Sequence, residues 1–372
     1  MNSYKKIYIG ILILLSILMT TACEKQPLKI GFIGSLTSKN SQLSIDARNA
    51  ISLGIEQVNA NGGINGRLIE FIVKDDGADP EVALQMHDAF IDENVSLVLG
   101  HMTSNMAEPV LKSQSEKLLF VSPTMGSSSL LGLDDYFIRT FPLTNNQAEA
   151  FFKLIDELKV KNALILYDIM NADYTEKMAK HAEAINPSLS NIQLKLVPFD
   201  SRVDDLKSIA RQIAGEKDIE LVLLVSQAID TAVISQVIKK EKPEIILCSV
   251  FWSMTEDLLL NGGDAIEKMY LIGLSKSETP SEAYIQFRAD FFDKYKYEPS
   301  GSSILAYDAF NVLLEGIKNA KDDSPKNVKK AILDKKEFLG LEESFEIDNF
   351  GDNNRTFGIY QLIENSFVPL YN

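Results

Sequence analysis

The sequence is poor in the residues that carry most disulfide and metal chemistry. Its 372 residues include two cysteines, three histidines and one tryptophan. Two cysteines cannot build a disulfide framework, and their surroundings lack the spacing of a zinc site. Basic side chains are also scarce, with 37 Lys and Arg against 52 Asp and Glu and a net charge of −15. Because nucleic-acid binding requires cations that neutralise phosphates, we expect no nucleic-acid partner.

The common nucleotide-binding and hydrolase motifs are also missing from the sequence. There is no phosphate-binding Gly-x-x-x-x-Gly-Lys-Ser/Thr, and Gly31–Gly34 lacks the Gly-x-Gly-x-x-Gly spacing. Gly126–Ser129 is followed by Leu130, so it is no nucleophile elbow. His101 precedes Ser104, but no nucleophile motif accompanies the pair, and a structural role for His101 is favoured. We therefore predict a protein that is not an enzyme and holds no metal or cofactor; a hydrolase using Ser104 and His101 is the weaker alternative.

Other reactive side chains have ordinary expected roles. His87 and His181 fall in helical segments, where we expect them on solvated faces. Asp75 and Asp76 are adjacent at a strand end, where carboxylates cap the next turn or face solvent more often than they bind a cation. Cys248 lies in an apolar run and is expected to be a small buried hydrophobe.

One long apolar run stands at the N-terminus. Residues 7–22 carry no charge and follow two lysines, which is typical of a signal peptide and short for a transmembrane span. The run ends in Met19-Thr20-Thr21-Ala22-Cys23, which resembles the lipobox of bacterial lipoproteins, with Thr20 where leucine is usual. We predict that 1–22 is a lipoprotein signal peptide and that Cys23 carries a lipid, the only membrane attachment. A plain cleaved signal peptide or a short anchor helix is the alternative.

The remaining chain alternates between strands and helices after a short tether at 23–27. Strands are predicted at 28–34 and 68–74, with an intervening helix over 44–59 and a second helix opened by Asp79 and Pro80. Further buried runs predict strands at 95–99, 118–122, 163–167, 192–198, 220–225, 245–249 and 269–273. Such alternation favours an α/β fold with parallel sheets covered on both faces, and the length favours two domains.

Two loops that follow predicted strands are rich in hydroxyl groups. One runs from Gly100 to Asn105 and the other from Ser122 to Ser129. Hydroxyls and free backbone N–H groups at a helix N-terminus can hold an anionic group. The same residues are equally suited to cap the helices that follow.

Segments throughout the chain share a further pattern. They are residues 29–37, 46–49, 58–67, 74–80, Ser122-Pro123, Arg139-Thr140, 305–309 and Gly351-Asp352, of which Asn61–Arg67 is the most diagnostic. Together they resemble the type I periplasmic binding proteins, specifically the branched-chain amino-acid (Leu/Ile/Val-type) receptors of ABC transporters.

This resemblance implies two Rossmann-like lobes with parallel sheets, joined by three crossovers, that trap a ligand by hinge closure. Lobe 1 would comprise 28–143 plus 275–353, and lobe 2 would comprise 144–274 plus 354–372. The resemblance also implies a monomeric, extracytoplasmic receptor that delivers a small molecule to ABC permease and ATPase subunits. A sensor that presents its ligand state to a signalling partner is the alternative.

The family's ligand contacts map unevenly onto this sequence. Its carboxylate-holding loop corresponds to Thr103 and Ser104, whereas its second loop loses a threonine hydroxyl that only Ser127 could replace. The acid that pairs with an amino acid's ammonium falls at or beside Phe251. The ligand-binding residues implied are Thr103, Ser104, Thr124, Met125, Ser127, Tyr174, Gln227, Phe251 and Trp252.

The replacement of an acid by Phe251 bears directly on the ligand. A buried ammonium without a carboxylate partner is strongly disfavoured, so Phe251 and Trp252 suit an apolar or aromatic group if they face the cleft. Ordinary packing of both rings is equally open. Acids from neighbouring loops could also supply the charge, namely Asp168, Asp173 or Asp230. We predict a small organic acid, amide or modified amino acid held at Ser104, rather than a branched-chain amino acid.

Overall fold

The computed structural model describes residues 25–371 apart from 39–40, 114–115 and 278. The predicted signal peptide, the lipidation site Cys23 and the start of the tether lie outside the described residues. Within the described ranges, no helix is both long and apolar enough to cross a membrane.

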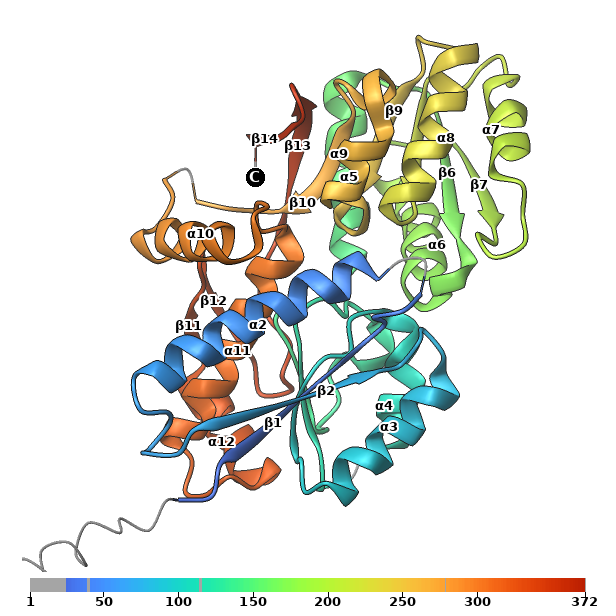
Figure 1. The fold of residues 1–372 in the computed structure, drawn as a ribbon. Coiled ribbons are helices and arrows are strands. Elements are labelled where there is room, and N and C mark those ends of the chain that lie inside the picture. Colours follow the sequence, from blue (N-terminus) through green and yellow to red (C-terminus); the bar gives the residue numbers. More distant parts are fainter. Residues whose placement is uncertain (1–24, 39–40, 114–115, 278, 372) are drawn as a thin grey trace, which may run out of the picture.

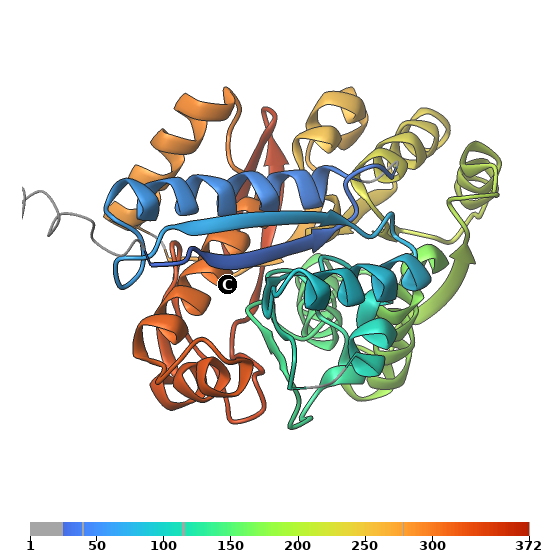
Figure 2. The ribbon, with the colours of Figure 1, turned by 60° about the horizontal axis from the view of Figure 1, so that its bottom comes forward.

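The first lobe is built on five parallel strands in the order β2-β1-β3-β4-β5 (Figure 1). They are β1 (Leu28–Gly34), β2 (Ile69–Asp75), β3 (Leu97–Leu99), β4 (Leu119–Ser122) and β5 (Phe137–Arg139). Helix α2 (Gln42–Ala60) packs on one face, whereas α3 (Pro80–Asp92) and α4 (Ala107–Lys112) pack on the other (Figure 2). Side chains of β1 alternate between the two, since Phe32 joins the α2 core and Ile33 the α3 core.

The second lobe is built on seven strands in the order β14-β13-β10-β9-β8-β6-β7. They are β6 (Asn162–Asp168), β7 (Gln193–Phe199), β8 (Leu221–Val225), β9 (Ile246–Val250), β10 (Tyr270–Leu274), β13 (Phe357–Ile363) and β14 (Ser366–Tyr371). Its helices are α5 (Asn145–Leu158), α6 (Ala172–Leu189), α7 (Leu206–Ala214), α8 (Ala228–Glu241) and α9 (Glu256–Gly262). Cys248 lies buried on β9, as predicted.

The C-terminal strands depart from the expected all-parallel sheets. Strand β13 runs antiparallel to β10, and β14 antiparallel to β13. Only Glu364 and Asn365 separate β13 from β14, and both have positive φ, 48° and 57°. Such a two-residue turn matches the twist of adjacent strands and needs no helical crossover. The sheet therefore ends in a hairpin instead of another βαβ unit.

Between β10 and β13 the chain returns to the first lobe. Helix α11 (Gly301–Asn319) packs on α2 and on strands of the first sheet, beside α10 (Glu282–Tyr295) and α12 (Pro325–Lys335). A small ladder follows, made of β11 (Glu337–Leu339) and β12 (Ser344–Glu346). The chain thus passes between the sheets three times, which confirms the predicted fold of two α/β lobes joined by three crossovers. The lobe boundaries drawn from the sequence stay predictions.

Buried polar contacts tie these passages together. Arg139, at the end of β5, forms an ion pair with Asp352 at 2.7 Å, and both side chains are buried. The amide of Asn353 donates to the carbonyl oxygens of Arg139 at 3.2 Å and Phe141 at 2.8 Å. The first and third crossings are therefore joined side by side.

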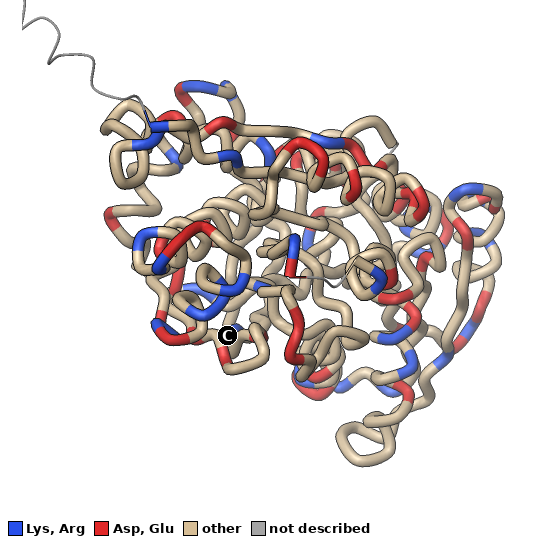
Figure 3. Tube along the Cα trace, turned by 90° about the horizontal axis from the view of Figure 1, so that it is seen from below, with Lys and Arg blue, Asp and Glu red and all other residues tan. Residues whose placement is uncertain are grey.

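A second buried ion pair holds the third crossing to the first lobe. Arg355 contacts Asp308 on α11, and the two side chains are 3% and 1% exposed. Asp308 also accepts the backbone N–H of Leu341 at 2.8 Å. Most other charges lie outside the core, and Figure 3 shows acidic and basic residues intermixed along the peripheral helices and loops.

Replacing Asp308 by alanine should lower the free energy of unfolding by about 3 kcal/mol, because Arg355 would stay buried without its partner. Chemical denaturation measures this loss. Asp334→Ala, which removes an exposed pair with Lys330, is the matched control and should cost less than about 0.5 kcal/mol. Equal effects of the two substitutions would contradict the role assigned to Asp308.

Candidate functional site

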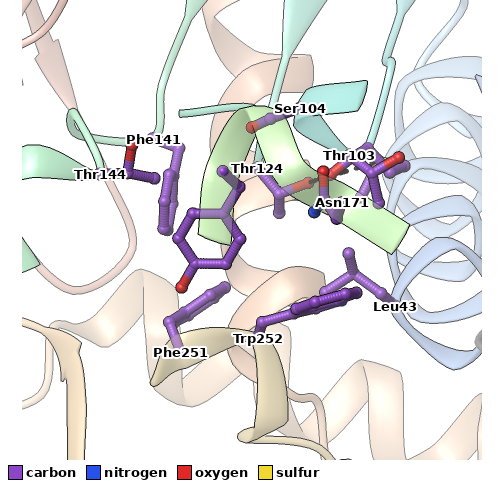
Figure 4. Close-up of a pocket in the computed structure, with 11 residues that line it drawn as sticks. Leu43, Thr103, Ser104, Thr124, Phe141, Thr144, Asn171, Phe251 and Trp252 are labelled. Atoms are coloured by element: carbon purple, nitrogen blue, oxygen red, sulfur yellow. Dashed lines mark hydrogen bonds between the residues drawn. The ribbon is translucent and has the colours of Figure 1, made fainter. Parts of the chain in front are cut away.

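A cavity lies between the lobes, where the carboxyl ends of first-lobe strands face loops of the second lobe (Figure 4). The lobes lie close together here, and the cavity volume between them is only about 20 Å³. Its lining residues are Leu43, Met102, Thr103, Ser104, Thr124, Phe141, Thr144, Asn171, Tyr174, Phe251 and Trp252. Apolar and hydroxyl side chains from both lobes converge on this cavity, so it is the candidate ligand site.

The first lobe supplies the hydroxyl side of the cavity through the loop after β3. Gly100 has φ +124°, and a Cβ there would lie 2.2 Å from the carbonyl oxygen of Ile33, so the turn requires glycine. Ser122 then donates to the carbonyl of His101 and Thr124 to that of Met102, each at 2.6 Å. These bonds fix the backbone immediately before Thr103 and Ser104.

The second lobe supplies an aromatic side. Phe251 and Trp252 open the short helix η4 (Phe251–Ser253) directly after β9. The ring of Phe251 lies 5.1 Å from that of Phe141, and Trp252 meets Tyr174 edge-on at 6.0 Å. The hydroxyl of Tyr174 donates to Gln147 at 2.7 Å, and burial raises its pKa, so the phenol stays neutral. Both rings pack against neighbours and also line the cavity.

Among the described residues, none that lines this cavity is charged. Asp168 accepts from Ser201 at 2.7 Å, and Asp173 is bonded to residues of the first lobe. Asp230 is buried and is also outside the cavity lining. An ammonium placed here would therefore have no carboxylate in the surrounding wall.

The structure places six of the residues implied by the resemblance around this cavity and three elsewhere. The six are Thr103, Ser104, Thr124, Tyr174, Phe251 and Trp252. Met125 is fully buried in the core beneath α3 and α4, and its backbone N–H donates to the hydroxyl of Ser122 at 3.1 Å. Ser127 faces Asp173, and Gln227 caps α8 by accepting the N–H of Ile229 at 3.2 Å.

Sequence reasoning missed five lining residues. They are Leu43, Met102, Phe141, Thr144 and Asn171. Asn171 lies one helical turn before Tyr174, and Met102 belongs to the loop from Gly100 to Asn105, so the positions of these two residues were available signals. Leu43 comes from the start of α2, and Phe141 and Thr144 come from the first crossing, where there is no local ligand pattern.

A polar contact joins the lobes beside the cavity, and we call it the closing contact. It consists of Ser127 and Ser129 from the first lobe with Asp173 and Lys177 from α6. The bond from Ser129 to Asp173 is 3.0 Å long. The carbonyl of Ser127 also accepts from Arg139 at 2.6 Å. The closing contact is therefore connected to the ion pair at the crossings.

Replacing Asp173 by alanine should favour the separated arrangement of the lobes, because the hydroxyls of Ser127 and Ser129 lose their common acceptor. Small-angle scattering of the ligand-free protein should show a larger radius of gyration. Glu176→Ala is the control, since Glu176 pairs with Lys180 on the same helix. Identical radii for the two variants would show that the closing contact does not hold the lobes together.

Two histidines correct an expectation from the sequence. His87 is 1% exposed rather than solvated, because its ring packs 4.9 Å from Phe120 and 5.0 Å from His101. Nε2 of His87 and Nε2 of His101 are 2.7 Å apart, and Nδ1 of His101 lies 2.9 Å from Asp76. His87 also contacts Ser113 through Nδ1.

This chain of contacts bears on the hydrolase alternative. Both ring nitrogens of His101 are occupied by Asp76 and His87, so neither is available to take a proton from Ser104. The contacts among Asp76, His101 and His87 instead anchor the loop that carries Thr103 and Ser104. Asp75, which directly precedes Asp76, accepts the backbone N–H of Leu36 at 2.8 Å and therefore has a capping role.

Burial and the neighbouring His101 lower the pKa of His87 to about 3, against an ordinary value of 6.5. Between these pH values the unfolded chain binds a proton that the folded protein does not, so stability falls as pH decreases from 6.5. Denaturation at several pH values should show that His87→Gln loses less stability than the unmodified protein as the pH falls through this range. The difference should be up to about 1.4 kcal/mol per pH unit. A slope unchanged in His87→Gln would contradict the assignment.

Two α/β lobes, three crossings and a cavity between the lobes define a bilobal ligand-binding protein. A family model described as periplasmic binding protein matches residues 27–365. The chain belongs to this family, and the resemblance seen in the sequence is confirmed.

Individual relatives cover nearly the whole chain. The leucine-, isoleucine-, valine-, threonine- and alanine-binding protein of Pseudomonas aeruginosa is 25% identical over 347 residues, covering 87% of this chain and 88% of the relative. A leucine-binding protein of Thermotoga maritima has a similar fold, with a TM-score of 0.84, 20% identity, and 92% and 97% of the two chains covered. A solute-binding protein of an ABC transporter from R. palustris, in complex with benzoate, matches with a TM-score of 0.83, 17% identity, and 93% and 96% covered.

Proposed function

We propose that the protein is the solute receptor of an ABC importer and captures a small carboxylate or amide ligand in the inter-lobe cavity. The observation that carries this proposal is the cavity wall, which combines the Thr103-Ser104 loop with Phe251 and Trp252 and includes no charged side chain. Membership of the periplasmic binding proteins supports a binding role over catalysis. The occupied ring nitrogens of His101 support it independently.

The same wall supports a ligand other than an ordinary amino acid. An α-amino acid brings an ammonium that must be paired when buried, and the cavity offers no acid. The hydroxyl of Thr103 donates to Oδ1 of Asn105 at 2.6 Å, so the hydroxyl of Ser104 is the one that suits a carboxylate or amide group. The aromatic rings suit an apolar body. The R. palustris relative, which holds benzoate, has a similar fold and supports an aromatic acid as one such ligand.

We further propose that the receptor works outside the cytoplasm as a lipoprotein attached through Cys23. The sequence before Cys23 supports this, because it combines two lysines, an apolar run and small residues. Removal of residues 1–22 would leave 350 residues with a net charge of −17, since two lysines leave with the peptide. The permease and ATPase subunits are the proposed partners, and a monomer is the proposed state.

Calorimetry on residues 24–372 tests the ligand class. Benzoate should bind, and Ser104→Ala should weaken it about 10-fold or more, because a hydrogen bond to a charged group contributes about 1.5–3 kcal/mol. Leucine, isoleucine and valine should show no submillimolar binding. Ser188→Ala, whose hydroxyl bonds within α6, is the control and should leave the affinity unchanged.

Tight binding of a branched-chain amino acid would overturn the proposed ligand class. Mass spectrometry of any molecule that copurifies identifies the natural ligand directly. A thermal-shift screen then extends the result, because a ligand that binds only the folded protein raises its melting temperature.

A further inference from the structure

A second cavity lies between the lobes on the other side of Phe251. The volume of this cavity is about 360 Å³. The second lobe contributes η4, the start of α9, the end of β10 and the turn between β13 and β14, and the first lobe contributes α10, the start of α11 and Glu342. Phe251 is in the lining of both cavities.

The ring of Phe251 is the partition between the two spaces. It is 6% exposed and meets Phe141 on the side of the first cavity. On the other side it is packed against Gly301, where a Cβ would lie only 2.6 Å from the ring. The ring therefore stands between the two cavities, and an elongated ligand that occupied both would pass beside it.

The second cavity carries the charge that the first one lacks. Its wall includes Glu256, Glu298 and Glu342 but a single cation, Lys276. Glu298 is engaged by Arg288 through bonds of 2.6 and 2.9 Å. Lys276 lies 5.4 Å from the ring centre of Tyr360. Burial raises the pKa of Glu342, and the positive charge of Lys276 partly offsets this rise. The balance of the wall is negative, which favours a cation.

A buried hydroxyl gives a second, independent indication of a ligand. Thr255 lines the cavity and is 4% exposed, and its Oγ1 has no hydrogen-bond partner among the described residues. A buried hydroxyl left unpaired is costly, so such groups are normally satisfied. The aromatic rings of Tyr284, Tyr360 and Phe367 surround the same space and can contact a cation through their faces.

We propose that the second cavity receives an ammonium group at the far end of an elongated ligand whose carboxylate lies at Ser104. This inference rests on the proposed function, because it takes the carboxylate position from it. Glu256 and Glu342 would pair with the ammonium, Thr255 would accept one of its N–H groups, and Phe251 would pack on the chain between the two ends. The ligand class is an ω-amino carboxylic acid, in which several bonds separate the amine from the carboxylate.

Matched pairs of probes test this directly by calorimetry. The pairs are hexanoate with 6-aminohexanoate and octanoate with 8-aminooctanoate, which differ only by the amine. An ammonium entering an uncharged apolar pocket weakens binding. The proposal predicts the reverse, with at least one amine probe binding 10-fold or more tightly than its parent acid.

The acids of the second cavity should account for that gain. Glu256→Gln with Glu342→Gln should abolish the advantage of the amine probe and leave the parent acid unaffected. Glu256→Gln alone serves if the double variant does not fold, and should remove part of the advantage. Glu183→Gln, on an exposed part of α6, is the matched control and should change neither affinity.

The outcomes separate this inference from the proposed function. If the parent acids bind in a manner that Ser104→Ala disrupts, but the amine weakens binding, the second-cavity inference is overturned and the proposed ligand class stands. An amine advantage that survives the double substitution also overturns it. If benzoate and all four chain probes fail to bind, the carboxylate position at Ser104 is wrong and both proposals fall.

Discussion

The ion pair between Arg139 and Asp352 connects the third crossing between the lobes to the loop beside the candidate ligand site. Arg139 ends the last strand of the first sheet, and Asp352 belongs to the third crossing. The same guanidinium bonds to the carbonyl of Ser127, whose side chain reaches Asp173 in the second lobe. Because an unpaired charge at this depth is costly, the pair fixes the crossings relative to the loop beside the cavity. Hinge, closing contact and ligand site thus share one buried anchor.

Much of the fold could be predicted because buried parallel strands are continuous apolar runs. The run predicted at 220–225 corresponds to β8 (Leu221–Val225), which is fully buried. Strand β14 escaped prediction, since it has intermediate and exposed residues and gives no such run, whereas β13 is largely buried and was also not predicted. The three-residue strands β11 and β12 are too short to produce any periodicity. His87 was misplaced because its partner His101 belongs to another element, and helical spacing alone cannot show a buried polar pair.

The candidate site followed from the sequence only where the family pattern supplied a position. Ser104, Phe251 and Trp252 were found in this way, and the structure gathers them around one cavity. The partners that position them come from distant segments, as with Thr124 on Met102 and Gly301 beside Phe251. The closing contact joins residues 44 to 48 positions apart in the chain, and no local pattern marks such a pairing.

The hairpin of β13 and β14 has a consequence for the order in which the sheet of the second lobe is completed. Strand β10 is paired on one side by β9 and on the other by β13, which follows in the sequence only after the chain has returned to the first lobe. Until that segment arrives, β10 presents a row of unpaired N–H and C=O groups at the edge of a hydrophobic sheet. Open edges of this kind are templates for pairing with other chains. A chain that lacked β13 and β14 would therefore leave this edge of its second lobe open to such pairing.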